Sequence, residues 1–259
     1  MELNKIVKKL QKKNGEIVTI EDIGDILDPG SKWLVRDKAR IHQVIYALKW
    51  LGTLISIRNG LYYVADGILH SWQEVVEARY WDIVKMIAHA EALKDWVIGG
   101  EKALELIMMD YSIPYQLIIY TKDIAKKVVV SPDHEIVFRT IISWEKKQRT
   151  NAFSILKKQS QSVDIQKQSF PVLGLESALL DALTIHDHEE GIGETLVLKF
   201  LKRYESRLER GNLGILVSVR YIRAMNRLRT IAKNHGYPRL YEIALDVIKK
   251  EWWGCFVTL

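Results

Sequence analysis

The sequence predicts an α+β protein of two domains, and three observations carry this prediction. The first 66 residues alternate helical patterns with short apolar runs and end in a hairpin signal. Several apolar runs of strand length follow between residues 96 and 168, and helical patterns fill the chain from about residue 173 onward. Helices that gather after a mixed sheet are typical of the α+β class. We therefore expect one domain over residues 1–66 and a second over residues 67–259.

The composition indicates how large a core the chain can bury and which cellular compartment we expect for it. With 259 residues, 48% of them hydrophobic, the chain can bury a sizeable core. Its formal net charge of +6 permits a polyanionic partner without requiring one. The single cysteine, Cys255, allows neither an internal disulfide nor a cysteine-based zinc site, which fits a reducing cytoplasm. The N-terminus lacks the apolar core of a signal peptide, and no run is apolar enough for a membrane span, so we expect a cytoplasmic protein with no membrane partner.

The first 30 residues predict two helices around a short strand. Leucine, isoleucine and valine recur with a helical period over residues 3–10, while lysines occupy most of the other positions. Residues 17 and 18 are β-branched and predict a strand. Thr19 is then a good N-cap, and Asp22 at the third helical position predicts a capping box for a helix over residues 20–27.

A third helix is predicted over residues 34–51, with Gly52 after its last turn. Its apolar positions recur at helical spacing: Ile41, Val44, Ile45, Leu48 and Leu51. Its first half carries polar side chains that would point outward: Arg36, Lys38, Arg40, His42 and Gln43. Arginine, glutamine and histidine can contact phosphates and base edges from a helix in the major groove. The alternative is that they form only the solvated face of an amphipathic helix.

The hairpin signal is the stretch LGTLISIRNGLYYV, residues 51–64. Asn59-Gly60 lies between two apolar runs and predicts a type I′ turn, because both residues tolerate positive φ. Arg58 and Asn59 would then lie at the tip, where a wing can touch DNA. The order helix, strand, helix, helix and hairpin is that of a winged helix-turn-helix, so we expect double-stranded DNA as the partner. Some winged helices bind proteins, which leaves a protein-interaction module without DNA readout as the alternative.

The rest of the chain predicts a mixed sheet followed by helices. A long helix is expected over residues 72–93, and a short strand from residue 96 leads through Gly99-Gly100 into another helix. Further strands are expected at residues 115–120, 127–130, 135–142, 152–156 and 163–168. Further helices are expected at residues 173–185, 193–204, 213–232 and 240–252.

Three stretches resemble the AbiEi-type family of antitoxins and transcriptional regulators. They are the hairpin LGTLISIRNGLYYV, the segment IGGEKALELIMMDYSIPYQLIIYT and the helix FPVLGLESALLDAL, in matching order over residues 1–190. Ile107 departs from the family, in which many members carry histidine, and Glu101 stands where serine is common. The resemblance implies a DNA-binding winged helix and a C-terminal antitoxin domain. It also implies repression of a neighbouring operon and opposition to a nucleotidyltransferase-like toxin.

Metal-binding signals are weak. His186 and His188, with the carboxylates that surround them, could ligate a divalent metal and support a metal-dependent enzyme. The alternative is a polar loop between two helices, and no second cluster at ligand spacing supports a metal. Asp110 is isolated and Asp181 lies on a leucine-rich helix, so the paired carboxylates of a two-metal site are missing.

A phosphate site is the other chemical candidate. Gly99-Gly100 before a helix could hold an anion at the helix N-terminus. However, Glu101 places a negative charge there, and no Lys-Ser/Thr follows as in a P-loop. We therefore predict that the chain is not an enzyme and that it holds no cofactor and no metal.

A second basic concentration lies in residues 199–229. Arg220, Arg223 and Arg227 fall at i, i+3 and i+7 and would share one helix face. They could form a second nucleic-acid surface or bind a partner such as a toxin or its target, and a solvated face is the alternative. Trp252 and Trp253 could pack in the core or dock on a second copy, which leaves the oligomeric state open.

Overall fold

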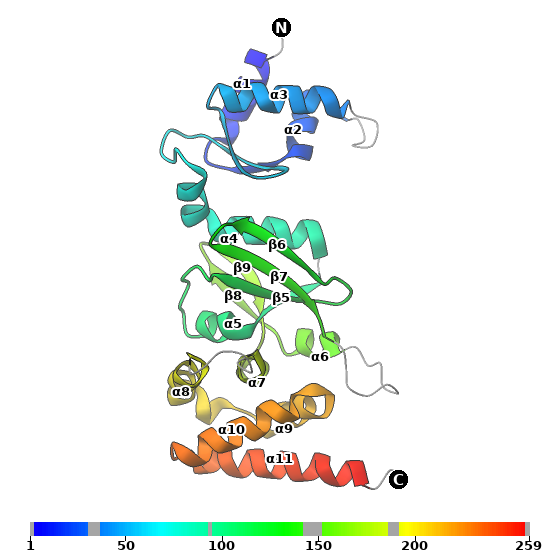
Figure 1. Cartoon of the computed structure of the whole chain (residues 1–259), viewed down its shortest axis with the longest axis vertical. Coiled ribbons are helices and arrows are strands. Elements are labelled where there is room, and N and C mark those ends of the chain that lie inside the picture. The colour runs from blue at the N-terminus through cyan, green and yellow to red at the C-terminus, as the bar shows by residue number, and fades with distance from the viewer. Residues whose placement is uncertain (1–2, 31–36, 93–94, 142–151, 186–191, 257–259) are drawn as a thin grey trace. The chain divides into compact units, whose positions relative to one another are not determined.

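The computed structural model in Figure 1 describes residues 3–30, 37–92, 95–141, 152–185 and 192–256. The chain divides into two compact units, Met1–Ile87 with Val129–Glu135 and Ala88–Val128 with Ile136–Leu259. The first unit therefore contains more of the chain than residues 1–66, and the domain boundary at residue 66 stays a prediction. Helices and two sheets coexist, and the C-terminal part is helical, which confirms the α+β class.

The first unit begins with three helices and a small antiparallel sheet. The helices are α1 (Leu3–Leu10), α2 (Ile20–Leu27) and α3 (Lys38–Trp50). The strands are β1 (Ile17–Thr19), β2 (Leu54–Arg58) and β3 (Leu61–Val64), paired in the order β1-β3-β2. Helix, strand, two helices and hairpin therefore follow one another in the order that the sequence predicts.

One hydrophobic cluster joins these elements. Its members come from all three helices and all three strands: Ile6, Leu10, Val18, Ile23, Ile41, Ile45, Leu48, Leu54, Tyr62 and Val64. Lys8 and Lys9 of α1 stay exposed, as the apolar stripe over residues 3–10 predicts. The capping box is also confirmed, because the Thr19 side chain accepts from the Asp22 N–H at 3.1 Å and the Thr19 N–H donates to Asp22 Oδ2 at 2.7 Å.

α3 begins later than predicted. Asp37 has an extended backbone, and its Oδ1 accepts the Arg40 N–H at 3.1 Å, so this N-cap starts the helix at Lys38 rather than at residue 34. The C-terminal end is as expected, since Gly52 has φ +70° and its N–H donates to Lys49 O at 3.0 Å. Leu51 is the C-cap and is half exposed rather than part of the buried stripe.

The hairpin forms, but its turn is not type I′. Gly60 has φ +80°, whereas Asn59 is not among the residues with positive φ. Arg58 pairs with Leu61, and a register shift between Ser56 and Arg58 adds one residue to β2. Such a bulge increases the local twist of the strand, so positive φ is needed at the glycine alone.

α4 (Trp72–Ala92) follows the hairpin and its connector. Its predicted face is buried: Val75, Val76, Tyr80, Ile83, Val84, Ile87 and Ala88. Arg79 has non-helical φ and ψ of −124° and 21°, so the helix is kinked at this residue.

A six-stranded mixed sheet follows. Its strands are β4 (Trp96–Gly99), β5 (Gln116–Thr121), β6 (Lys126–Ser131), β7 (His134–Thr140), β8 (Gln161–Ile165) and β9 (Gln168–Val172). They lie in the order β6-β7-β5-β4-β9-β8, and β4 is antiparallel to β5 and parallel to β9. α5 (Gly100–Ile107) packs on β4 and β5, and α7 (Leu175–Ile185) packs on β4.

Two of the predicted strands are wrong in detail. Residues 152–156 belong to a helix, α6 (Ala152–Lys158), whose buried residues Ala152, Phe153 and Leu156 have helical rather than alternating spacing. The strand expected at residues 163–168 is a hairpin of β8 and β9 instead. Its turn residues Gln166 and Lys167 have φ of 50° and 66°, a conformation that neither residue type signals in a sequence.

Helices complete the second unit. They are α8 (Ile192–Tyr204), α9 (Arg210–Leu216), α10 (Ile222–Asn234) and α11 (Pro238–Phe256). The single helix predicted over residues 213–232 is interrupted, because Val217–Tyr221 forms a π-helical turn between α9 and α10. Figure 1 shows α10 beside α11, and α10 also contacts α7. No helix in the described ranges is both long and apolar enough to cross a membrane.

Candidate nucleic-acid interface

α3 turns the polar side chains of its first half toward solvent. Ile41, Ile45 and Leu48 are buried in the core of the first unit and fix the rotation of the helix about its axis. The predicted DNA-binding residues of this helix that the structure describes are all exposed: Lys38, Arg40, His42 and Gln43. A basic and hydrogen-bonding helix face therefore stands next to a β-hairpin.

The hairpin carries two further predicted contacts. Arg58 ends β2 and is half-buried, and Asn59 is exposed in the turn that follows. Both lie at the tip of the hairpin, where the sequence predicts a contact with DNA. Arg36, the remaining predicted contact, lies outside the described residues.

Two exposed aromatic side chains on α3 are not among the site residues that the sequence predicts. Tyr46 is 74% exposed and Trp50 is 81% exposed. Tryptophan is highly buried on average, so a tryptophan with most of its surface in water calls for an explanation. The signal that predicts their exposure is the helical period, because residues 43, 46 and 50 fall opposite the buried positions 41, 45 and 48.

The second predicted basic surface is less uniform than its spacing suggests. Arg223 is exposed on α10, but Arg227 is half-buried and its Nη1 donates to Leu183 O at 2.6 Å. Arg227 thus bonds a carbonyl in the last turn of α7, an interaction that stabilises helix ends. The side chain of Arg220 is outside the described part, and its backbone lies in a π-helical turn, which departs from the α-helical period that the prediction assumes.

Asp181, which the sequence places on a leucine-rich helix, is at the centre of a buried hydrogen-bond network. Its side chain is 2% exposed and accepts three hydrogen bonds, at 2.7 Å from the Gly100 N–H, 2.8 Å from the Tyr120 hydroxyl and 3.0 Å from the Tyr221 hydroxyl. It therefore links α7 to α5, to β5 and to the π-helical turn. The same contact argues against an anion site at the N-terminus of α5. The first N–H of that helix, that of Gly100, already donates to a carboxylate of the chain.

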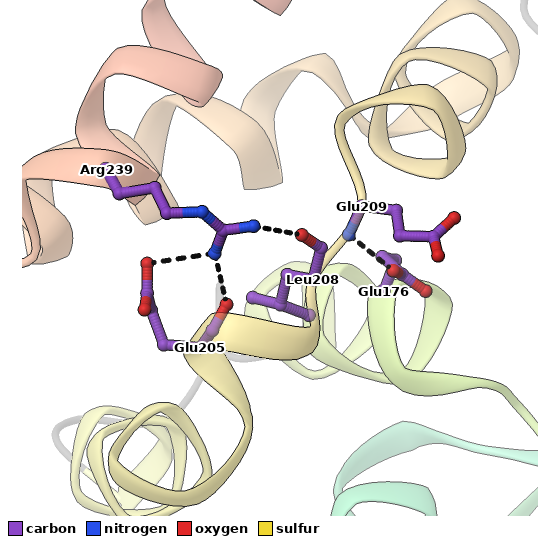
Figure 2. A network of polar contacts seen from close by, with 5 residues as sticks. All are labelled: Glu176, Glu205, Leu208, Glu209 and Arg239. Carbon is purple, nitrogen blue, oxygen red and sulfur yellow. Dashed lines mark hydrogen bonds and ion pairs between the residues drawn. The ribbon is translucent and has the colours of Figure 1, made fainter.

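A polar cleft of about 820 Å³ lies beside the start of α7, and Arg239 is among its lining residues. Figure 2 shows Arg239 donating to Glu205 O at 2.8 Å and to Leu208 O at 3.0 Å. In the same view, the Glu209 N–H donates to Glu176 Oε1 at 2.8 Å. These bonds fix the segment between α8 and α9 against α7 and α11, so the charged groups of the network have a structural role.

The described residues contain no group of three or more histidine, cysteine, aspartate and glutamate side chains that could hold a metal ion. The predicted candidates His186 and His188, with their neighbouring carboxylates, lie outside the described ranges.

No family model and no curated protein match the sequence. The chain is similar to the crystal structure of the RV2827C protein from Mycobacterium tuberculosis, with a TM-score of 0.60 and 17% sequence identity. The match covers 95% of this chain and 80% of that chain. At this identity, the two proteins have a fold in common, and the likeness says nothing about activity.

Proposed function

We propose that the protein is a DNA-binding transcriptional regulator that inserts α3 into the major groove. The observation that carries this proposal is the exposed polar face of α3, directly ahead of a β-hairpin. Lys38 and Arg40 would neutralise phosphates, and Gln43 is a residue type that pairs with the edge of adenine. The major groove is about 12 Å wide and admits an α-helix.

The hairpin would act as the wing in this arrangement. Arg58 at the end of β2 would contact the phosphate backbone or the minor groove, and Asn59 would lie beside it. Because the hairpin offers one cation, base readout would depend mainly on α3.

Fluorescence anisotropy tests this function. The full-length protein is titrated into a labelled duplex from the region upstream of its own gene, and into a shuffled duplex of the same length and composition. We expect tighter binding to the upstream duplex, and weaker binding to both as salt rises, because released counterions drive association. No binding to either duplex at low salt would exclude the proposal.

The resemblance to AbiEi-type antitoxins extends the proposal to a cytoplasmic repressor of its own operon. Under this proposal the second unit opposes a nucleotidyltransferase-like toxin. The test is expression of the neighbouring open reading frame with and without this chain. We expect growth arrest that the chain relieves, and an adjacent gene without toxicity would contradict the antitoxin role.

A protein-interaction module is the second candidate, and the exposure of Tyr46 and Trp50 is the observation that favours it. Aromatic side chains are enriched in protein interfaces. This candidate predicts no salt-dependent binding to random duplex DNA, so the titrations above separate the two functions.

A further inference from the structure

The centre of the solvent-facing side of α3 is aromatic. Helical residues advance by about 100° each, so Gln43 and Trp50, seven positions apart, lie nearly in line along the axis. Tyr46 lies between them on the same side. This line is opposite Ile41, Ile45 and Leu48, which are buried. Whatever approaches α3 along its outward direction therefore meets Gln43, Tyr46 and Trp50 first.

Cationic side chains flank this aromatic line on both sides. Lys38 and Lys49 project near one edge and Arg40 near the other, and all three are exposed. Two basic edges around an apolar centre match a partner that is negatively charged at its rims and offers apolar groups between them. The major groove of DNA has this chemistry, with phosphates along both rims and thymine methyl groups on its floor.

A second copy of the chain fits this face less well. Two identical α3 helices would bring lysine and arginine edges together, and like charges brought close to one another oppose association. The formal net charge of +6 adds to this repulsion.

We propose that Tyr46 and Trp50 determine specificity for thymine by contacting its 5-methyl group in the major groove, a proposal that rests on the DNA-binding function above. The methyl group is the apolar feature that distinguishes thymine from the other bases in that groove. Gln43, in line with the two rings, can pair with adenine N6 and N7, so the face as a whole suits A·T-containing sites. Burying one methyl group against a ring is expected to strengthen binding about fourfold.

Uracil substitution tests the proposal without altering the protein. The upstream duplex is prepared once with thymine and once with uracil at every thymine position, which removes the methyl groups and keeps the hydrogen-bonding edges. The wild-type chain should bind the thymine duplex at least about fourfold more tightly. Equal affinity for the two duplexes would overturn the proposal and leave DNA binding intact, whereas no binding to either would overturn both.

Two variants assign the effect to the two rings. The double variant Tyr46→Ala/Trp50→Ala should bind both duplexes equally, with the salt dependence of the wild type, because no cation is lost. Tyr115→Ala, which removes an exposed tyrosine of the second unit, is the matched control and should keep the preference for thymine. A double variant that still prefers thymine would contradict the proposal.

Sedimentation of the wild type and the double variant tests whether a second copy of the chain binds to the aromatic face of α3 instead of DNA. We expect the same mass for both proteins. A dimer that the double variant abolishes would assign the aromatic face to self-association and overturn its role in DNA recognition.

Discussion

In the first unit, the polar and aromatic side chains of α3 point into solvent, whereas in the second unit the polar side chains around Asp181 are buried and bonded to one another. Tyr46 and Trp50 expose most of their surface. By contrast, Asp181 accepts three hydrogen bonds. Lys102 is similar, since it is 3% exposed and its Nζ donates to Ser112 Oγ at 2.9 Å.

The difference separates groups available to a partner from groups that hold the fold. A buried polar group without a hydrogen bond is costly, so the bonds of Asp181 satisfy a structural need. The exposed rings of α3 bury little of their surface within their own unit. Variants should therefore fall into two classes, one that lowers stability and one that lowers DNA affinity.

Asp181→Ala should give the largest loss of stability. It removes the hydrogen bonds of Asp181 to the Tyr120 and Tyr221 hydroxyls and to the Gly100 N–H, and losing the partner of a buried polar group costs about 1–3 kcal/mol. We expect a decrease in the free energy of unfolding of about 3 kcal/mol or more, measured by denaturant unfolding. Asp164→Ala, at an exposed position of β8, is the control and should be close to neutral. Equal stabilities for the two variants would contradict a structural role for the hydrogen bonds of Asp181.

Gly99→Ala should destabilise the same region by crowding. A Cβ at Gly99 would lie 2.2 Å from a ring carbon of Tyr120 and 3.0 Å from Asp181 Oδ2. Overpacking of this kind costs about 1–3 kcal/mol, and a thermal melt should detect it. The matched control is Gly211→Ala in α9, where a Cβ would meet nothing within 4 Å and helix propensity favours alanine. A Gly99→Ala protein as stable as this control would contradict the tight packing of this core.

Thr19→Ala removes a structural polar contact from the first unit. The loss of the capping box of α2 should cost about 1 kcal/mol. Thr19→Ser keeps the accepting hydroxyl and should restore most of the stability. Both proteins should bind duplex DNA as the wild type does. A large loss of affinity in either would contradict the separation between variants that lower stability and variants that lower DNA affinity.

The smallest effect concerns acid stability. The Tyr63 hydroxyl donates to Asp66 Oδ2 at 2.7 Å, and this bond, with backbone N–H groups, holds the pKa of Asp66 below its ordinary value of 3.8. A lowered pKa in the folded state contributes stability above pH 3.8, and this contribution is lost as the pH falls through the folded pKa.

Tyr63→Phe tests that effect. It should raise the pKa of Asp66 toward its ordinary value, which an NMR titration of the carboxyl carbon measures directly. An unchanged titration would show that the backbone N–H groups alone depress this pKa.

Much of the first unit could be predicted because its signals are local. Thr19 and Asp22 form their capping box within one turn of helix, and the apolar period of α1 is set by eight consecutive residues. The prediction of a type I′ turn at Asn59-Gly60 is wrong because the bulge in β2 depends on pairing with β3. The exposure of Tyr46 and Trp50 could also be predicted from the sequence, because both fall opposite the apolar positions 41, 45 and 48 in any helix that contains these residues.

The second unit resisted prediction where contacts join distant residues. Asp181 meets groups 40 to 81 positions away along the chain, and no local spacing reveals such a network. The Gln166-Lys167 turn lacks the glycine or asparagine that marks positive φ. The π-helical turn Val217–Tyr221 likewise has no sequence signal, so α9 and α10 were merged into one predicted helix.

The salt dependence of duplex binding for Lys38→Ala/Arg40→Ala tests DNA recognition by α3 most directly. The control is Lys8→Ala/Lys12→Ala, which removes the same charge from exposed positions outside α3. The α3 variant should lose about tenfold or more in affinity. Its negative slope of log K against log salt should become shallower by about 0.9 for each phosphate contact removed, while the control keeps the slope of the wild type. Equal affinities and slopes for both variants would contradict DNA recognition by α3.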